Sequence, residues 1–261
     1  MKKLGIIVAR KGSQRFPNKH HVLLLGKPMF AYTLEASLES KLLDRIVVSS
    51  DDFELKKLTE QYGIEFITRP PELATAASAL DDAVRHVCRY LEQRDEFQPD
   101  VVLTFQGNVP IRKEGQIDDL ILRFKELPKA TAICTAQESF LRPEWASVIT
   151  DEVTGEATPF LQGKFPYRTQ DFPRLFYMDG AIYGVRIKTL WEQEGKKEAH
   201  AWFGSDIHLI LQDSSMYSHE IDYPHQVQLA EFYLMCKKYG DAWYKDMEIK
   251  NLIPLQTKVG D

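Results

Sequence analysis

Four cationic side chains fall within ten residues near the start of the chain, at Arg10, Lys11, Arg15 and Lys19. Between them, Gly12 and Ser13 let the backbone turn and present N–H groups to an anion. A triphosphate carries about four negative charges, which a cradle of cations and backbone donors matches. The spacing fits neither the G-x-x-x-x-G-K-[ST] loop nor the G-x-G-x-x-G fingerprint. The segment therefore predicts a phosphate-binding loop of another kind, with a solvated basic loop as the alternative.

The overall composition limits the partners of such a loop. The 261 residues carry a net charge of −5, with 44% hydrophobic and 27% charged residues, as in ordinary globular proteins. A general nucleic-acid binder needs a basic surface, so we expect no nucleic-acid polymer as a partner. The three cysteines have neither disulfide nor zinc spacing. No apolar run has the length of a signal peptide core or a membrane span, so we expect a cytoplasmic protein without a membrane partner.

Alternating strand-like and helix-like patterns position the loop. Apolar runs rich in β-branched residues predict strands at 4–9, 45–49, 64–67, 101–105 and 131–135. Helical patterns appear at 28–40, 52–62, 78–91 and 117–124, with Asp51 or Asp52 placed to cap the second. This alternation predicts an α/β fold with a Rossmann-like, mostly parallel sheet covered by helices on both faces. Ligands of such sheets lie beyond the carboxyl ends of the strands, so the loops after Ala9, Ser49, Ile67 and Phe105 should converge on one site.

The alternation breaks at 139–178, a stretch rich in proline, aromatic and charged residues without a clear helical pattern. We interpret it as an inserted subdomain or arm. Beyond it we predict two strands and an amphipathic helix, at 179–185, 216–222 and 224–239. Residues 1–240 are therefore expected to form a single domain that contains the insertion, followed by a C-terminal tail at 241–261.

Several motifs in a fixed order carry a family resemblance. The phosphate loop reads A-R-x-G-S-x-R-x-P-x-K at 9–19, and G-K-P-M and V-V-S-S-D follow it. The later motifs are R-P-P-E-L-A at 69–74, Q-G-N-V-P-I-R at 106–112, Q-D-F-P at 170–173, D-G-A-I-Y at 179–183 and E-I-D at 220–222. Over residues 4 to about 232 the chain resembles the sugar-acid cytidylyltransferases, which include the acylneuraminate and Kdo synthetases. The resemblance implies a nucleotide-diphospho-sugar transferase fold with the insertion as a dimerisation arm.

The resemblance also implies nucleotide-binding residues. Arg10 and Lys19 would bind the triphosphate and act in catalysis, with Gly12 and Ser13 contributing to the loop. Three further residues would contact the nucleotide: Arg69, Ser78 and Gln106. Gln106 would face both nucleotide and sugar. The alternatives are that Arg69 forms a surface ion pair and that Gln106 ties loops together.

A magnesium ion is implied at Asp222, in the position of the family's I-D-T-P motif. Glu220 is a second candidate ligand, because alternate residues of a strand share one face. Asn108 is a weaker candidate, since it stands where the Kdo branch has aspartate and an amide is a poorer ligand than a carboxylate. The alternative for Asp222 is a helix cap before Pro224.

The sugar side departs most from the family. The implied sugar-binding residues are Gln106, Arg168, Asp179 and Tyr183. Asp179 replaces the asparagine of N-G-A-I-Y, and Thr169 replaces an arginine that many sialic members have, which leaves Arg168 as the carboxylate clamp. His20 likewise replaces a common asparagine.

The expected reaction is an attack of the anomeric hydroxyl of a 2-keto sugar acid on the α-phosphorus of CTP, with release of pyrophosphate and with Mg²⁺ bound. The arm implies a homodimer in which one subunit completes the partner's sugar site, with Phe165 and Tyr167 as contacts. Two alternatives remain: a nucleotidyltransferase for another nucleotide or acceptor, and a non-catalytic CTP-binding homologue.

Overall fold

Seven strands form the central sheet of the computed structural model, which describes residues 1–139 and 141–240. The strands are β1 (Lys3–Val8), β4 (Arg45–Ser50), β5 (Glu65–Thr68), β6 (Val101–Gln106), β7 (Ala132–Glu138), β10 (Phe176–Arg186) and β11 (Ile207–Leu211). Their order is β11-β7-β10-β6-β1-β4-β5. Only β10 runs antiparallel to its neighbours among these strands. The predicted mostly parallel sheet is confirmed.

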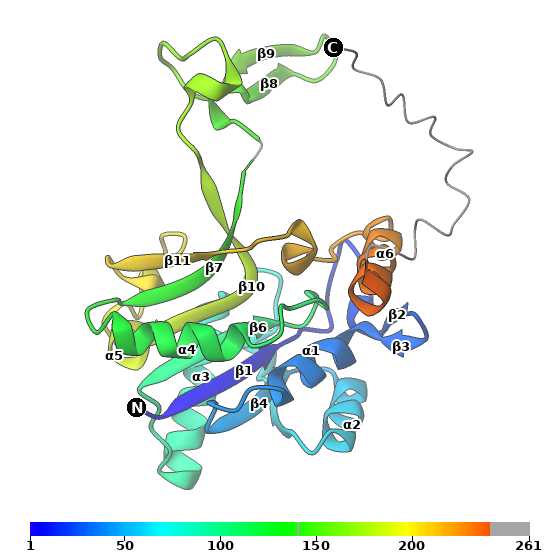
Figure 1. Cartoon of the computed structure of the whole chain (residues 1–261), viewed down its shortest axis with the longest axis vertical. Helices are drawn as coiled ribbons and strands as arrows, with labels where there is room; N and C mark the ends of the chain where they lie inside the picture. Colours follow the sequence, from blue (N-terminus) through cyan, green and yellow to red (C-terminus); the bar gives the residue numbers. More distant parts are fainter. Residues whose placement is uncertain (140, 241–261) are drawn as a thin grey trace.

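Helices cover both faces of this sheet (Figure 1). One face packs against α1 (Met29–Leu38), α2 (Phe53–Gln61) and α4 (Gln116–Glu126). The other packs against α3 (Leu80–Asp95), α5 (Ile187–Glu192) and the 3-10 turn η5 (Ala201–Phe203). Within β1, Ile7 belongs to the first core, and Leu4 and Ile6 belong to the second. Burial on both faces explains why the sequence of β1 is continuously apolar.

Local sequence signals account for several helix ends. Asp52 caps α2, because its carboxylate accepts a 3.0 Å hydrogen bond from the backbone N–H of Glu54. Pro28 stands at the N-cap of α1 rather than within its first turn. The last helix, α6 (Gln226–Tyr239), packs with the hairpin of β2 (Leu23–Leu24) and β3 (Lys27–Pro28). No helix in the described ranges has both the length and the apolar character required to cross a membrane.

The predicted strand at 216–222 is wrong. The segment forms the 3-10 turn η6 (Ser215–Ser218) and then an irregular stretch. Its Ile221 N–H donates to the carbonyl of Asn108 at 2.9 Å, so a loop contact takes the place of a sheet ladder. The seventh strand is instead β11, which lies beside β7 at the sheet edge and whose pattern did not stand out in the sequence.

The insertion is a hairpin that stands away from the α/β body (Figure 1). β7 and β10 extend out of the sheet toward it, and it carries β8 (Ser147–Asp151) and β9 (Glu156–Pro159). Apolar and aromatic side chains on it are exposed: Val153 is 95% accessible and Tyr167 is 98% accessible. The predicted tail at 241–261 lies outside the described residues.

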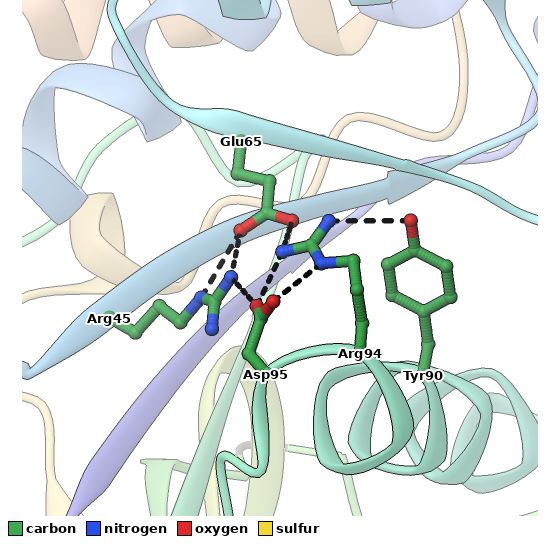
Figure 2. A network of polar contacts seen from close by, with 5 residues as sticks. All are labelled: Arg45, Glu65, Tyr90, Arg94 and Asp95. Atoms are coloured by element: carbon green, nitrogen blue, oxygen red, sulfur yellow. Dashed lines mark hydrogen bonds and ion pairs between the residues drawn. The ribbon is translucent and has the colours of Figure 1, made fainter.

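A network of charges ties the amino-terminal edge of the sheet together (Figure 2). Arg45 of β4 donates to Glu65 of β5 at 2.6 Å and to Asp95 of α3 at 2.6 Å. Arg94 of α3 forms ion pairs with the same two carboxylates. The carboxyl-terminal edge, where ligands are expected, stays free of this network.

Candidate functional site

A cavity of about 550 Å³ opens at the carboxyl ends of β1, β5 and β6. Its lining includes residues from the loop after β1, from the segment after β5 and from the loop after β6: Arg10, Ser13, Gln14, Arg15, Lys19, Arg69, Leu73, Ser78, Leu80, Gln106 and Asn108. Glu220 and Asp222 complete the wall. Three of the four loops expected to meet therefore line one cavity, and the fourth, after β4, supports it through contacts of Ser49 and Asp51 described below.

The loop after β1 is fastened at several points. The backbone N–H of Lys11 donates to Asp51 at 2.9 Å, and Arg10 donates to the carbonyl of Thr75 at 2.6 Å. Ser13 N–H bonds the carbonyl of Lys11 at 2.9 Å, which closes a tight turn. Asn18 has a left-handed backbone with φ of 54°. These contacts direct Arg10, Ser13 and Lys19 into the cavity, and Gly12 lies outside its lining.

Asp222 receives the two cations at the far end of the loop. Lys19 Nζ lies 2.7 Å from Asp222 Oδ1, and Arg15 pairs with Oδ2 of the same carboxylate. A hydrogen bond with Tyr223 and the charge of Asp222 raise the pKa of Arg15 above its ordinary value. Two cations and a carboxylate thus meet in the wall of the cavity, an arrangement that suits the binding of a phosphate group.

Asn108 joins the two carboxylates of the E-I-D segment. Its amide Nδ2 donates to Glu220 Oε1 at 3.0 Å and to Asp222 Oδ1 at 3.1 Å. Burial raises the pKa of Glu220, and the charge of Asp222 adds to that rise while the Asn108 hydrogen bond opposes it. Asn108 therefore turns its donor toward the carboxylates, which is the opposite of what a metal ligand offers.

Arg69 lies buried at the floor of the cavity. Its guanidinium donates to the carbonyl of Ser49 at 2.8 Å and to the Ser49 hydroxyl at 3.2 Å. Burial lowers the pKa of Arg69 to about 10, against the charge of Asp51. The alternative of a surface ion pair is wrong, because the side chain is 6% exposed and bonds backbone and hydroxyl oxygens.

Ser78 belongs to the wall beside Arg69, where the segment 72–80 folds back on itself. Its hydroxyl donates to the carbonyl of Glu72 at 3.0 Å and accepts the backbone N–H of Thr75 at 3.0 Å. The same turn receives Arg10 at the Thr75 carbonyl. Ser78 therefore shapes the wall as well as lining it.

Gln106 ends β6 at the mouth of the cavity. A Cβ at Gly180 would come 2.6 Å from Gln106 Nε2 and 3.6 Å from the hydroxyl of Tyr183. Gly180 also has a φ of +76°, a conformation that glycine adopts without strain. The lack of a side chain at Gly180 thus makes room for the Gln106 amide, a role that the sequence reasoning missed.

Three predicted sugar-binding residues lie outside the lining of this cavity. Arg168 is on the exposed arm and pairs with Asp171 at 2.9 Å. Tyr183 is buried against Trp202 and Phe203. Asp179 is buried within the fold, where protein groups bind both of its carboxylate oxygens. A direct sugar contact by these residues stays a prediction, and within one chain the geometry does not bring them to the nucleotide cavity.

His20 is a further lining residue without an assigned role in the sequence. It is 4% exposed and packs edge-on against Phe30. Burial lowers the pKa of His20 to about 3, and the charge of Lys19 adds to this effect. The ring is therefore neutral at physiological pH and serves as a wall rather than as a cation.

Comparison with known proteins places the chain among the cytidylyltransferases. A family model described as cytidylyltransferase matches residues 4–228. N-acylneuraminate cytidylyltransferase of Streptococcus agalactiae is 30% identical over 185 residues, which are 70% of this chain and 43% of that protein. CMP-N,N'-diacetyllegionaminic acid synthase of Legionella pneumophila is 30% identical over 234 residues, 88% of this chain and 95% of that protein. The chain thus spans less than half the length of the first relative.

A solved structure shares the fold. A CMP:2-keto-3-deoxy-manno-octonic acid synthetase complexed with CTP matches with a TM-score of 0.67 at 18% identity, covering 91% of this chain and 100% of that chain. The predicted nucleotide-diphospho-sugar transferase type of sheet is confirmed by this likeness.

Proposed function

The chain belongs to the cytidylyltransferase family, and we propose that it transfers CMP from CTP to the anomeric hydroxyl of a 2-keto sugar acid, with release of pyrophosphate. The acid would be sialic acid, a related nonulosonic acid or Kdo. The observation that carries the proposal is the meeting of Arg10, Arg15 and Lys19 with Glu220 and Asp222 in one cavity. Cations that neutralise a leaving pyrophosphate and carboxylates that hold a divalent cation are the groups that this transfer requires.

Positioning and charge neutralisation supply most of the catalysis in such a transfer. Arg10 and Lys19 would hold the β- and γ-phosphates, with the hydroxyl of Ser13 as a further donor from the loop. Arg69, Ser78 and the apolar Leu73 and Leu80 form the wall on which the nucleoside would rest. The in-line attack would then proceed from the side of Gln106, where the sugar acid approaches the α-phosphorus.

A magnesium ion fits the donor set of Glu220 and Asp222. Within the described part of the chain, no three His, Cys, Asp or Glu side chains gather as a metal site, so phosphate oxygens and water must complete the coordination. Burial and the charge of Asp222 raise the pKa of the Glu220 carboxyl, and a cation beside it would favour the charged carboxylate. When bound, Mg²⁺ supplies charge neutralisation of the triphosphate oxygens. Asn108, which donates its amide, would hold the carboxylates rather than ligate the ion.

The arm supports a homodimer. Its exposed apolar surface and the separation of Arg168 from the cavity of its own chain agree with an arm that reaches a second subunit. Arg168 would there clamp the carboxylate of the sugar acid, with Tyr167 beside it. Arg168 pairs with Asp171 in the isolated chain, so this partner is exchanged when the sugar acid binds.

The test is acceptor profiling with the full chain, CTP and Mg²⁺. Sialic acid, legionaminic acid, pseudaminic acid and Kdo are each supplied, and pyrophosphate and CMP-sugar are measured, with neutral hexoses as controls. We expect product with at least one acid and with none of the hexoses. Thermal shifts with CTP, UTP, GTP and ATP check the nucleotide. A folded protein that CTP stabilises but that releases no pyrophosphate with any acid contradicts the transferase and leaves a CTP-binding protein.

A further inference from the structure

Asp179 is a buried carboxylate that the mechanism above does not use. It is 5% exposed. Its Oδ1 accepts hydrogen bonds from the Thr135 hydroxyl at 2.5 Å and from the Ala181 N–H at 3.0 Å, and its Oδ2 accepts one from the Ser218 hydroxyl at 2.5 Å. In the described ranges no lysine or arginine forms an ion pair with it. Burying a carboxylate is costly unless it is paired or hydrogen-bonded, and at Asp179 these three hydrogen bonds offset the cost.

The three donors belong to three different segments. Thr135 is in β7, Ala181 is in β10, and Ser218 is in η6. The register of β10 against β7 shifts between Met178 and Tyr183, so Asp179 lies inside a β-bulge. Bulges redirect side chains and recur next to active sites. The Asp179 carboxylate thus joins three segments: the bulge of β10, the strand β7 and the turn η6.

Arg112 also binds the bulge, through the carbonyl of Ala181. Its buried guanidinium donates to the Ala181 carbonyl at 3.1 and 3.2 Å and to the Gln106 carbonyl at 3.0 Å. The N–H of Ala181 is bound by Asp179 and its carbonyl by Arg112. Burial lowers the pKa of Arg112 to about 9, and the negative charge of Asp179 opposes that fall. Two opposite charges therefore fix one residue of the bulge without touching each other.

The bulge sets the position of the Gln106 side chain. Gly180 is the residue between Asp179 and Ala181, and a Cβ there would meet the Gln106 amide at 2.6 Å. Gln106 lines the cavity beside Asn108. Because there is no room for even one added carbon between Gly180 and the Gln106 amide, a shift of the bulge toward Gln106 would displace that amide.

The η6 contact reaches the opposite wall of the cavity. Ser218 comes two residues before Glu220 and four before Asp222. The segment is tied again at Ile221, whose N–H donates to the Asn108 carbonyl at 2.9 Å. Asp179 and Asn108 thus anchor the carboxylate segment at two points.

We infer that Asp179 is a positioning residue that fixes Gln106 relative to the Glu220–Asp222 pair through the bulge of β10 and the turn η6. The inference rests on the proposed function, because it assigns Asp179 to the geometry of the transfer rather than to a sugar contact. The sugar acid would meet Gln106, and Asp179 acts behind it.

Asp179→Ala, Asp179→Asn and Ser218→Ala test the inference, with Asp213→Asn as a control that changes an exposed carboxylate paired with Lys113. A misplacement of about 1 Å costs about 100-fold in rate, so we expect Asp179→Ala to lower kcat about 100-fold. The KM for CTP should change less than about twofold, because Arg10, Lys19 and Arg69 are untouched. Asp179→Asn should keep most activity, since the amide oxygen still accepts from Thr135 and Ala181 while its nitrogen donates to the Ser218 oxygen.

Hydrogen exchange provides a readout that does not depend on turnover. On the CTP-bound full chain, Asp179→Ala should speed exchange in peptides covering both 176–183 and 214–222, and Ser218→Ala only in 214–222, with about a tenfold loss of kcat. Asp213→Asn should match the wild type. Should Asp179→Ala fail to fold, Ser218→Ala still decides: unchanged kcat together with unchanged exchange overturns the inference.

Two further outcomes separate this inference from its premise. A raised KM for the sugar acid at unchanged kcat in Asp179→Ala shows a direct sugar contact and overturns the positioning role. A wild-type chain that transfers CMP to no acid overturns the proposed function, while the exchange experiment still reports whether Asp179 joins the two segments.

Discussion

At the scale of single residues, Asp222 is the carboxylate on which the cations of the phosphate loop meet. Lys19 and Arg15 pair with its two oxygens, and Asn108 adds a third donor. Bound CTP brings about four negative charges to the same place. Under the proposed function, Lys19 and Arg15 would exchange the carboxylate for phosphate, which would leave Asp222 available to a divalent cation. The ion pairs of Asp222 with Lys19 and Arg15 therefore hold in place the groups that we propose to bind the triphosphate.

Lys19→Ala tests this exchange, with Lys11→Ala as its matched control in the same loop. A hydrogen bond to a charged group contributes about 1.5–3 kcal/mol, so Lys19→Ala should lower kcat/KM for CTP by about 10- to 100-fold. Lys11 lies outside the lining of the cavity, and its contact to Asp51 uses the backbone N–H, so Lys11→Ala should lower kcat/KM less than about threefold. Equal losses in the two variants would assign the loop a general electrostatic role instead. Steady-state kinetics at varied CTP give the comparison.

His20 predicts a pH dependence of stability. Its pKa is lowered to about 3 by burial, whereas an unfolded histidine titrates near 6.5. As pH falls below about 6.5, the unfolded chain binds a proton that the folded chain does not, so folding loses about 1.4 kcal/mol per pH unit from this group. Urea unfolding between pH 7 and pH 5 should show this slope. In His20→Asn, the change of the free energy of unfolding with pH should be smaller by about 1.4 kcal/mol per pH unit.

His200→Asn is the control for this slope. His200 is exposed and has a left-handed backbone, with φ of 63°, which asparagine tolerates. The control should keep the slope of the wild type. A wild-type slope identical to that of His20→Asn would mean that the buried ring titrates normally.

Asn108→Asp places a third carboxylate beside Glu220 and Asp222. The amide donor that joins them is lost, and three like charges meet at a buried position. Without metal the variant should melt lower by roughly 5 °C. Mg²⁺ should raise its Tm more than that of the wild type. Thermal melts in EDTA and in Mg²⁺ decide, and an Asn108→Asp melt that is insensitive to Mg²⁺ contradicts a cation site at these carboxylates.

At the scale of elements, the ion-pair network of Figure 2 joins β4, β5 and α3 at the edge away from the cavity. Networks of partly buried charges contribute more than isolated surface pairs. Glu65→Gln should lower Tm by about 2 °C, and by less in 0.5 M salt, without changing KM for CTP. Glu54→Gln removes an exposed pair with Lys57 on α2 and should leave Tm unchanged. A Tm change in Glu65→Gln equal to that control would reduce the network to surface charges.

Strands buried on both faces could be predicted from sequence alone. Residues 4–8 and 101–105 are apolar apart from Gly5 and Thr104, because helices cover both sides of these strands. The segment 216–222 could not be, because its alternating pattern fits a strand equally well. Its irregular path follows from the hydrogen bond of Ile221 to Asn108 and from the Ser218 contact with Asp179, which join residues about 40 or more positions apart.

At the scale of the whole molecule, the arm separates two halves of the proposed site. The cavity lies at the strand ends, and Arg168 stands on the hairpin beyond the body. Sequence motifs could predict the residues of the cavity and the arm residue Arg168, because each half of the proposed site has a motif of its own. They could not predict that Asp179 and Tyr183 lie behind the cavity wall, because burial by Thr135, Trp202 and Phe203 is a property of the folded chain.

Mixing two inactive variants tests the assembly. Arg168→Ala would remove the clamp from the arm, and Lys19→Ala the phosphate contact from the cavity. If the arm completes the partner's site, refolding the two together gives heterodimers with one intact site, and activity should return to about a quarter of the wild type. Each variant refolded alone is the control. No recovery, with a dimer shown by sedimentation, would place Arg168 outside the partner's site.

Strand β10 runs for 11 residues without a break, from the root of the arm at Phe176 to Arg186. The same strand contains the bulge against which Gln106 rests. Residues 183–185 pair with both β6 and β7, whereas residues 176–178 pair with β7 alone, so β10 connects the root of the arm first to the bulge and then to the sheet. If the arm docks on a second subunit, a displacement of the hairpin would be passed along this strand to the bulge. The proposed docking of two chains would then influence the geometry around Gln106 in each of them.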